Sequence, residues 1–209
     1  MGAGNAKQDL QRYRDGYPGD IDDKDANDNY LFYTNQLESS PHGDYIENIL
    51  TKWKGNYEIL EAHHGYIQWL FPIREHGMNS LSQKLQKHEI EKIRADPQCI
   101  ERLIRAYELM LDFYGIKLKD KTTGELERAS NYKSRYRNLN SSSHNYLRIT
   151  RILKCLGEFG LESWKKYFID YMIEEVWVNR LLPNCASSLR YYWVETLRND
   201  EERYVFIWC

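Results

Sequence analysis

The chain has 209 residues, 42% of them hydrophobic, and its 29 Lys and Arg stand against 31 Asp and Glu, which gives a net charge of −2. A chain of this length can bury a substantial core, as one domain or as two small ones. The near-neutral total argues against a protein that coats nucleic acid over its whole surface, although it allows a local basic patch.

The cysteines and the first residues bear on the compartment. The four cysteines stand singly, with no C-x-x-C pair, which favours a reducing compartment. The start, MGAGNAKQDL, lacks the apolar region of a secretory signal, and no apolar run approaches the roughly 18–20 residues of a membrane span. We therefore expect a protein that is neither secreted nor membrane-spanning, and we expect the natural chain to continue beyond Cys209.

Residues 1–29 read as an acidic, turn-rich segment that contains the run DIDDKDANDN. If Asp23 began a calcium-binding loop, the sixth position would have to be Gly and the twelfth a bidentate Glu. Those positions hold Asp28 and Thr34, so we expect a solvated acidic loop rather than a calcium site. Residues 30–209 are then expected to form the folded helical domain.

Apolar spacing and capping residues predict several helices in this domain. Asp44 can cap a helix whose apolar residues recur at helical spacing and which Gly55 would end. Residues 57–64 predict a second helix. The strongest prediction is 98–114, where apolar residues step by three and four along one face and Gly115 follows the last of them.

Three more helices are predicted towards the C-terminus, beginning near Ser143, Ser163 and Ser187. Period-2 patterns are few, and only 116–118 and 203–208 read as extended. The fold class expected is therefore all-α, a compact single-domain and bundle-like array of helices with little or no β structure.

The stretch YIQWLFP at 66–72 concentrates aromatic and apolar side chains until Pro72 stops the run. Large aromatic side chains dominate the energetics of protein cores, which predicts that Trp69 and Phe71 are buried. The alternative is a docking groove in which Tyr66 or Trp69 serves as an exposed aromatic anchor.

Metal patterns in the sequence are incomplete. Glu61 and His64 have the Glu-x-x-His spacing of a ferritin-like di-metal site, but such a site needs a second copy, which is missing. His88 begins an H-E-x-x-H pattern that fails because Lys92 stands where the second His belongs. We expect no metal and no cofactor.

Catalytic signatures are also missing, since the chain contains no G-x-S-x-G, G-x-G-x-x-G or P-loop motif. Cys155 and His144 could form a catalytic pair only if the fold brought them together. Cys155 follows apolar neighbours, which favours a packed thiol. We expect a protein that is not an enzyme.

The charge pattern is one-sided between Glu127 and Glu158, because cations occur there with no Asp or Glu among them. Arginines in such a segment can hold phosphates, an acidic peptide or a carboxylate through paired hydrogen bonds. Five of these cations form a candidate patch for an anionic partner: Arg135, Arg137, Arg148, Arg151 and Lys154. The alternative is that the cations of this segment pair with acids elsewhere, such as Glu174 and Glu175 or the acidic N-terminal loop.

Three stretches carry a family resemblance, namely NYEILEAHHGYIQWLFPIRE at 56–75, ERLIRAYELMLDFYGIKLKD at 101–120, and NYKSRYRNLN with SHNYLRITRILKCLGEFGLE within 131–162. Together they resemble the conserved region of the opioid growth factor receptor family. The resemblance covers most of the chain from about residue 30 to 162, and more loosely beyond.

The resemblance implies a non-canonical opioid receptor, unlike the seven-helix receptors. Members of the family are described as binding methionine-enkephalin, occurring in the nucleus, at its envelope and in the cytoplasm, and restraining cell proliferation. It also implies nuclear-import or other protein partners, because members usually add a polar tail with basic nuclear-targeting segments. The competing hypothesis is a helical scaffold that binds acidic proteins or nucleic acid through 128–154.

Overall fold

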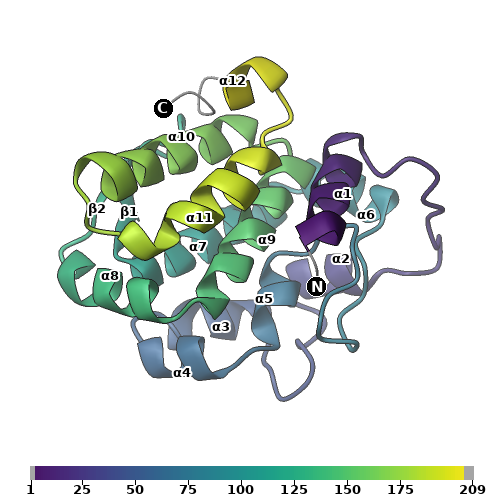
Figure 1. Cartoon of the computed structure of the whole chain (residues 1–209). Helices are drawn as coiled ribbons and strands as arrows, with labels where there is room; N and C mark the ends of the chain where they lie inside the picture. Colours follow the sequence, from purple (N-terminus) through teal and green to yellow (C-terminus); the bar gives the residue numbers. More distant parts are fainter. Residues whose placement is uncertain (1–2, 205–209) are drawn as a thin grey trace. The chain divides into compact units, whose positions relative to one another are not determined.

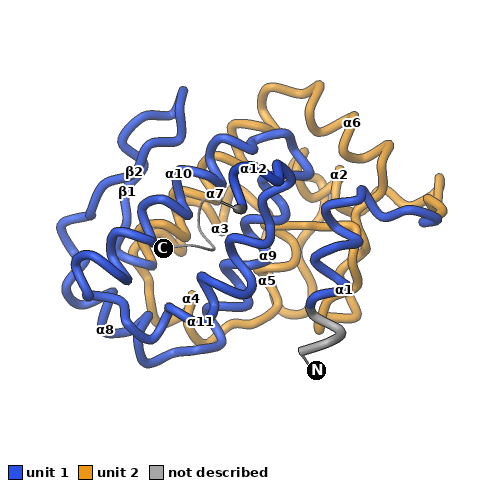
Figure 2. Tube along the Cα trace, turned by 45° about the horizontal axis from the view of Figure 1, so that its top comes forward, with its two compact units in different colours: residues 1–20, 114–209 blue, residues 21–113 orange. Residues whose placement is uncertain are grey.

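The structure is a computed structural model that describes residues 3–204. Helices dominate these residues, and one small two-stranded sheet joins them, so the predicted all-α class is confirmed. Contacts divide the chain into two compact units, residues 1–20 with 114–209 (unit 1) and residues 21–113 (unit 2), which Figure 2 colours separately. The expected boundary at residue 30, between an acidic N-terminal segment and the helical domain, stays a prediction. The division by contacts falls at other positions.

Unit 2 contains six helices among its described residues, which Figure 1 labels, and the last of them ends at Tyr114, a residue that belongs to unit 1. They are α2 (Asp28–Tyr33), α3 (Ile46–Lys52), α4 (Tyr57–Ala62), α5 (Tyr66–Leu70), α6 (Lys87–Ala95) and α7 (Pro97–Tyr114). α7 matches its prediction closely: Asp96 accepts a hydrogen bond from the Gln98 amide at 2.8 Å, and Gly115 follows the helix with a φ of +81°. α4 ends two residues before the predicted His64 because His63 has extended backbone.

Unit 1 begins with α1 (Ala3–Arg14), which the sequence patterns did not predict, and continues after α7. Its remaining elements are β1 (Ile116–Leu118), β2 (Leu126–Arg128), α8 (Tyr132–Ser141), α9 (His144–Glu158), α10 (Glu162–Ile173), the π-helical turns η1 (Glu174–Val178) and η3 (Leu189–Trp193), the 3-10 turns η2 (Pro183–Cys185) and η4 (Val194–Thr196), α11 (Ala186–Ser188) and α12 (Asp200–Tyr204).

The small sheet of unit 1 is an antiparallel pair in which Ile116 lies opposite Arg128 and Leu118 opposite Leu126. The prediction of an extended segment at 116–118 is therefore confirmed. The other extended segment, at 203–208, falls mostly outside the described residues, and its first two residues belong to α12. 

α9 is the central helix of unit 1, where it contacts α10, η3 and η4. Its residues Ile149, Ile152 and Leu153 are buried and form the apolar stripe of an amphipathic helix. Arg14 ties α1 to the C-terminal part of the unit, because its guanidinium donates to both the backbone and the carboxylate of Glu195 at 2.7 Å.

The aromatic stretch YIQWLFP lies in the core of unit 2. Trp69 is 2% exposed and Phe71 is fully buried, which confirms the prediction for both. The Trp69 indole packs 5.4 Å from the Phe32 ring and donates to the Ser40 carbonyl at 2.9 Å. The Tyr66 hydroxyl donates to the Leu60 carbonyl at 3.0 Å. Because both polar tips are satisfied inside the unit, neither Tyr66 nor Trp69 is an exposed anchor.

Candidate interaction surface

The structure separates the five cations of the predicted patch. Arg137 is exposed and Arg135 and Arg151 are half-buried, but Arg148 is only 6% exposed and Lys154 only 5%. The prediction that Arg148 and Lys154 lie on an exposed face of α9 is therefore wrong. The reason is tertiary, because a residue far away in the sequence can cover a side chain, as Tyr13 of α1 does for Lys154.

Lys154 belongs instead to a buried polar cluster around Tyr13 of α1. Its ammonium lies 5.6 Å from the centre of the Tyr13 ring, and the Tyr13 hydroxyl donates to the Lys154 carbonyl at 3.2 Å. Two more cations face the same ring, Lys165 at 5.2 Å and Arg198 at 4.5 Å. Cations are attracted to the negative face of an aromatic ring, so this arrangement helps to hold α1 in place.

Carboxylates balance the cations of this cluster. Arg198 donates to Glu158 at 3.1 Å and to Glu162 at 3.1 Å, and Lys165 pairs with Glu162 at 2.6 Å. Burial lowers the pKa of Lys165 to about 8, although Glu162 opposes that shift. Lys165 is fully buried, so the cluster is a structural network rather than a surface that could receive a ligand.

Gly157 lets Tyr13 approach α9 closely. A Cβ atom at this position would lie 2.0 Å from the Tyr13 hydroxyl oxygen and 2.8 Å from the Lys165 nitrogen. Gly157 lies inside α9, and Gly160, with a φ of +82°, follows the end of the helix.

His63 and Glu89 have structural partners. The Gly65 amide donates to Nδ1 of His63 at 3.2 Å, which places the proton on Nε2, 3.2 Å from the His42 carbonyl. The Glu89 carboxylate is fully buried and accepts hydrogen bonds from the Asn29, Tyr30 and Gln86 amides and from two side-chain amides. Among the side chains that the structure describes, no three His, Cys, Asp or Glu gather where a metal ion could be held.

The thiols of the described residues are buried and protonated. Burial raises the pKa of Cys99 and of Cys185 to about 12, and it raises that of Cys155 well above the usual range. A reactive cysteine needs a lowered pKa and access to solvent. Cys155 is therefore a packed thiol, as its apolar neighbours predicted.

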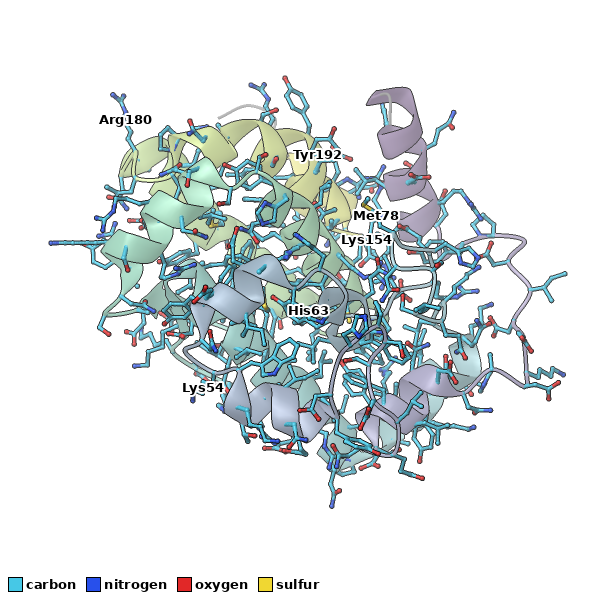
Figure 3. The ribbon with its side chains drawn as sticks, turned by 90° about the horizontal axis from the view of Figure 1, so that it is seen from below. Lys54, His63, Met78, Lys154, Arg180 and Tyr192 are labelled. Carbon is cyan, nitrogen blue, oxygen red and sulfur yellow. The ribbon has the colours of Figure 1, made fainter. Side chains whose placement is uncertain are left out.

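Exposed cations occur in unit 1, but mostly at positions other than those predicted. Lys133 and Arg137 lie on α8, Arg180 lies in the turn after η1, and Arg190 lies in η3; all four are exposed. Figure 3 shows the Arg180 side chain projecting away from the ribbon. Exposed apolar side chains lie near Arg180 in the chain, with Val178 at 70% and Leu181 at 39% exposure.

The sequence of α8 contains a pattern that indicates the exposure of Lys133 and Arg137. Tyr136 and Leu139 are the buried residues of this helix, and they lie one turn apart on one side. Helical periodicity then turns Lys133 and Arg137, four residues apart, towards another side. The exposure of Arg180 has no comparable signal, because it depends on the path of a turn.

One cation of the acid-free segment between Glu127 and Glu158 pairs with an acid elsewhere in the chain, which was the alternative to a binding patch. Arg128 binds the buried carboxylate of Glu175 through two nitrogens, at distances of 2.8–3.1 Å. Glu175 is one of the two acids that the sequence suggested as partners. The pairing raises the pKa of Arg128, and it leaves Arg128 unsuited to bind a second anion.

No helix within residues 3–204 is both long and apolar enough to cross a membrane.

Comparisons with known proteins identify the family of the chain. A family model described as the opioid growth factor receptor conserved region matches residues 22–208. The chain is 48% identical to opioid growth factor receptor-like protein 1 of Mus musculus over 200 residues, and 46% identical to the opioid growth factor receptor of Homo sapiens over 201 residues. Each alignment covers 95% of this chain, but only 43% and 30% of those relatives.

The chain therefore spans less than half the length of these relatives. No solved structure matches it. Identity at this level over nearly the whole chain is decisive for ancestry, and the chain belongs to the opioid growth factor receptor family.

Proposed function

We propose that the chain is the conserved module of a receptor unlike the seven-helix opioid receptors, that it binds methionine-enkephalin, and that it acts in the negative regulation of cell proliferation. The observation that carries the proposal is the identity of 46–48% to proteins named opioid growth factor receptor or receptor-like protein. The matched relatives are named as receptors, which supports a binding module rather than an enzyme.

We further propose that the protein works in the cytoplasm and the nucleus and at the nuclear envelope, with nuclear-import factors or other proteins as partners. The proposal rests on family membership. The chain spans under half of the length of its matched relatives, so the localisation is proposed for the family and not from a signal within this chain.

Isothermal titration calorimetry with methionine-enkephalin tests the proposal directly. Saturable binding to the full chain is expected, while the same five residues in scrambled order should give no heat. A peptide with an amidated C-terminus tests the carboxylate, which we expect to contribute to affinity through an arginine. Equal heats for the authentic and scrambled peptides would contradict enkephalin binding by this module.

A second candidate is a helical scaffold that binds acidic proteins or nucleic acid through residues 128–154. The observation in its favour is the absence of Asp and Glu between Glu127 and Glu158 in the sequence. Burial of Arg148 and Lys154 weakens it in its original form, because buried cations cannot meet a partner. Nucleic-acid binding that falls steeply with salt would support this candidate over the receptor module.

A further inference from the structure

α8 and the turn at residues 178–184 form one continuous surface of unit 1. Figure 1 shows α8 beside the chain that leads from α10 to α11, and η2 contacts it. The Asn140 side chain donates to the Leu181 carbonyl at 2.8 Å, and the Asn184 side chain donates to the Asn140 carbonyl at 2.9 Å. These bonds fix the turn against the C-terminal end of α8.

Lys133 and Arg137 lie on the side of α8 that meets this turn. Positions 133, 137 and 140 are four and three residues apart, so they share one face of the helix, and Asn140 touches the turn. Arg180 adds a third cation from the turn, where it precedes Leu181, the residue whose carbonyl accepts from Asn140. In the part of the chain that the structure describes, no carboxylate pairs with Lys133, Arg137 or Arg180.

The turn is held in a shape that leaves two apolar side chains outside. The Leu181 and Leu182 amides both donate to the Glu175 carbonyl, at 2.8 and 3.2 Å, and Asn179 donates to the Glu175 carboxylate at 3.0 Å. Leu182 takes the buried position, while Val178 and Leu181 remain exposed. A surface whose shape is fixed before binding loses less entropy when a partner docks.

We propose that the face formed by Lys133, Arg137, Val178, Arg180 and Leu181, here called the α8–turn face, binds an acidic segment of a partner protein that carries an apolar side chain. Lys133, Arg137 and Arg180 are exposed and no carboxylate of the described residues pairs with them, so these cations can attract the carboxylates of a partner. Val178 and Leu181 offer an apolar contact beside those charges. The proposal does not depend on enkephalin binding.

Two other occupants fit the face less well. Nucleic acid bound as single strands relies on aromatic side chains that stack with bases, and the apolar residues of this face are aliphatic. A second copy of the chain could offer only part of its acidic loop. Asp20 is paired with Arg12 at 2.7 Å and Asp22 accepts from Arg74 and from the Lys87 amide, which leaves Asp23 and Asp25 exposed. A partner with uncommitted carboxylates therefore matches the face better.

Fluorescence anisotropy on the full chain tests this proposal. The probe is a fluorescein-labelled peptide of glutamates interrupted by leucines, long enough to lie along α8, at low ionic strength. We expect Arg137→Glu with Arg180→Glu to weaken binding at least about tenfold, because two attractive charges become repulsive. Lys7→Glu with Lys121→Glu changes the net charge equally on exposed residues of unit 1 outside the face, and should change affinity less than about twofold.

The apolar part has its own comparison. The double variant Val178→Ser with Leu181→Ser should bind the leucine-containing peptide more weakly than the parent does. It should bind a control peptide, in which serines replace the leucines, with the affinity of the parent. Both positions are exposed, so thermal melting should show that these variants fold like the parent. If the parent bound the leucine-containing and the serine-containing peptides with equal affinity, the proposed apolar contact would be overturned.

The remaining outcomes identify another occupant or none. Tighter binding of an oligothymidylate of equal charge, lost in the Arg137→Glu and Arg180→Glu variant, would overturn a protein partner in favour of nucleic acid. Self-association in sedimentation velocity that the same variant abolishes would assign the face to a second copy. Peptide binding that is equal in the parent and in this variant would remove the face from function. Enkephalin calorimetry on the same variant reports separately on the proposed receptor function.

Discussion

The Lys165 ammonium donates a hydrogen bond to the Tyr13 hydroxyl at 3.0 Å, across 152 positions of the sequence. Both residues are fully buried, and the same ammonium also donates to the Thr196 carbonyl at 2.7 Å and pairs with Glu162. One nitrogen thus connects α1, α10 and η4. Because removing one partner of a buried polar network leaves the others unsatisfied, this cluster should contribute strongly to the stability of unit 1.

The lowered pKa of Lys165 predicts a pH-dependent stability. Lys165 loses its proton at about pH 8 in the folded protein but only near pH 10.4 when unfolded. Between these values the unfolded state binds more protons, so this residue makes stability rise with pH, by up to about 1.4 kcal/mol per pH unit. Below pH 8 both states are protonated and the contribution is constant.

Urea denaturation of the parent and of Lys165→Met from pH 7 to 10 measures this contribution as the difference between the two curves. The buried thiols act in the opposite direction, because their raised pKa values favour proton binding by the folded state, but they are common to both proteins. Lys166→Met, a partly exposed neighbour, serves as the control and should keep the parent's slope. Parallel curves for the parent and Lys165→Met would contradict the prediction.

The close approach of Tyr13 to Gly157 predicts a strong coupling between the two positions. Gly157→Ala should lower the free energy of unfolding by about 1–3 kcal/mol, because the new methyl group collides with the Tyr13 hydroxyl. Tyr13→Phe removes that oxygen. Chemical denaturation of both single variants and the double variant should therefore show a double variant more stable than the sum of the single effects; additive effects would mean that the collision lies elsewhere.

Trp69 should behave as a core residue. Trp69→Ala should cost about 3–5 kcal/mol of unfolding free energy, since the side chain is buried and its indole N–H is bonded. Tyr191→Ala, at an exposed aromatic, should change stability by less than about 0.5 kcal/mol. A melting temperature that Trp69→Ala leaves unchanged would return Trp69 to the role of an exposed anchor.

The Glu89 carboxylate should be required for joining α2 to α6. Every group that forms a hydrogen bond with this carboxylate is a donor. Glu89→Gln turns an amide N–H₂ towards other N–H groups, so it should lower the free energy of unfolding by about 2–4 kcal/mol. Glu91→Gln on the same helix is exposed and provides the control. Equal urea midpoints for the two variants would contradict a structural role for Glu89.

The candidate surface could be predicted from the sequence only in part. Local spacing gives the exposed side of α8, since Tyr136 and Leu139 mark its inner side, but no such pattern gives the direction of Arg180, which sits in a turn with a φ of 56°. The choice of Arg148 and Lys154 failed for a related reason. An amphipathic pattern assumes that the polar side of a helix meets water, but in α9 Arg148 and Lys154 are buried while the apolar Leu147 is 66% exposed.

The sequence by itself determined the helical class, the limits of α7, the buried state of the YIQWLFP segment and the family, because these follow from local periodicity, capping and conserved runs of residues. Only the tertiary structure decided which cations reach solvent and which, like Lys154 and Lys165, lie buried around Tyr13. α1 shows the physical reason: its place in unit 1 depends on Lys154, Lys165 and Glu195, all far along the chain. A side chain's environment is set by such distant neighbours, and local sequence patterns carry no information about them.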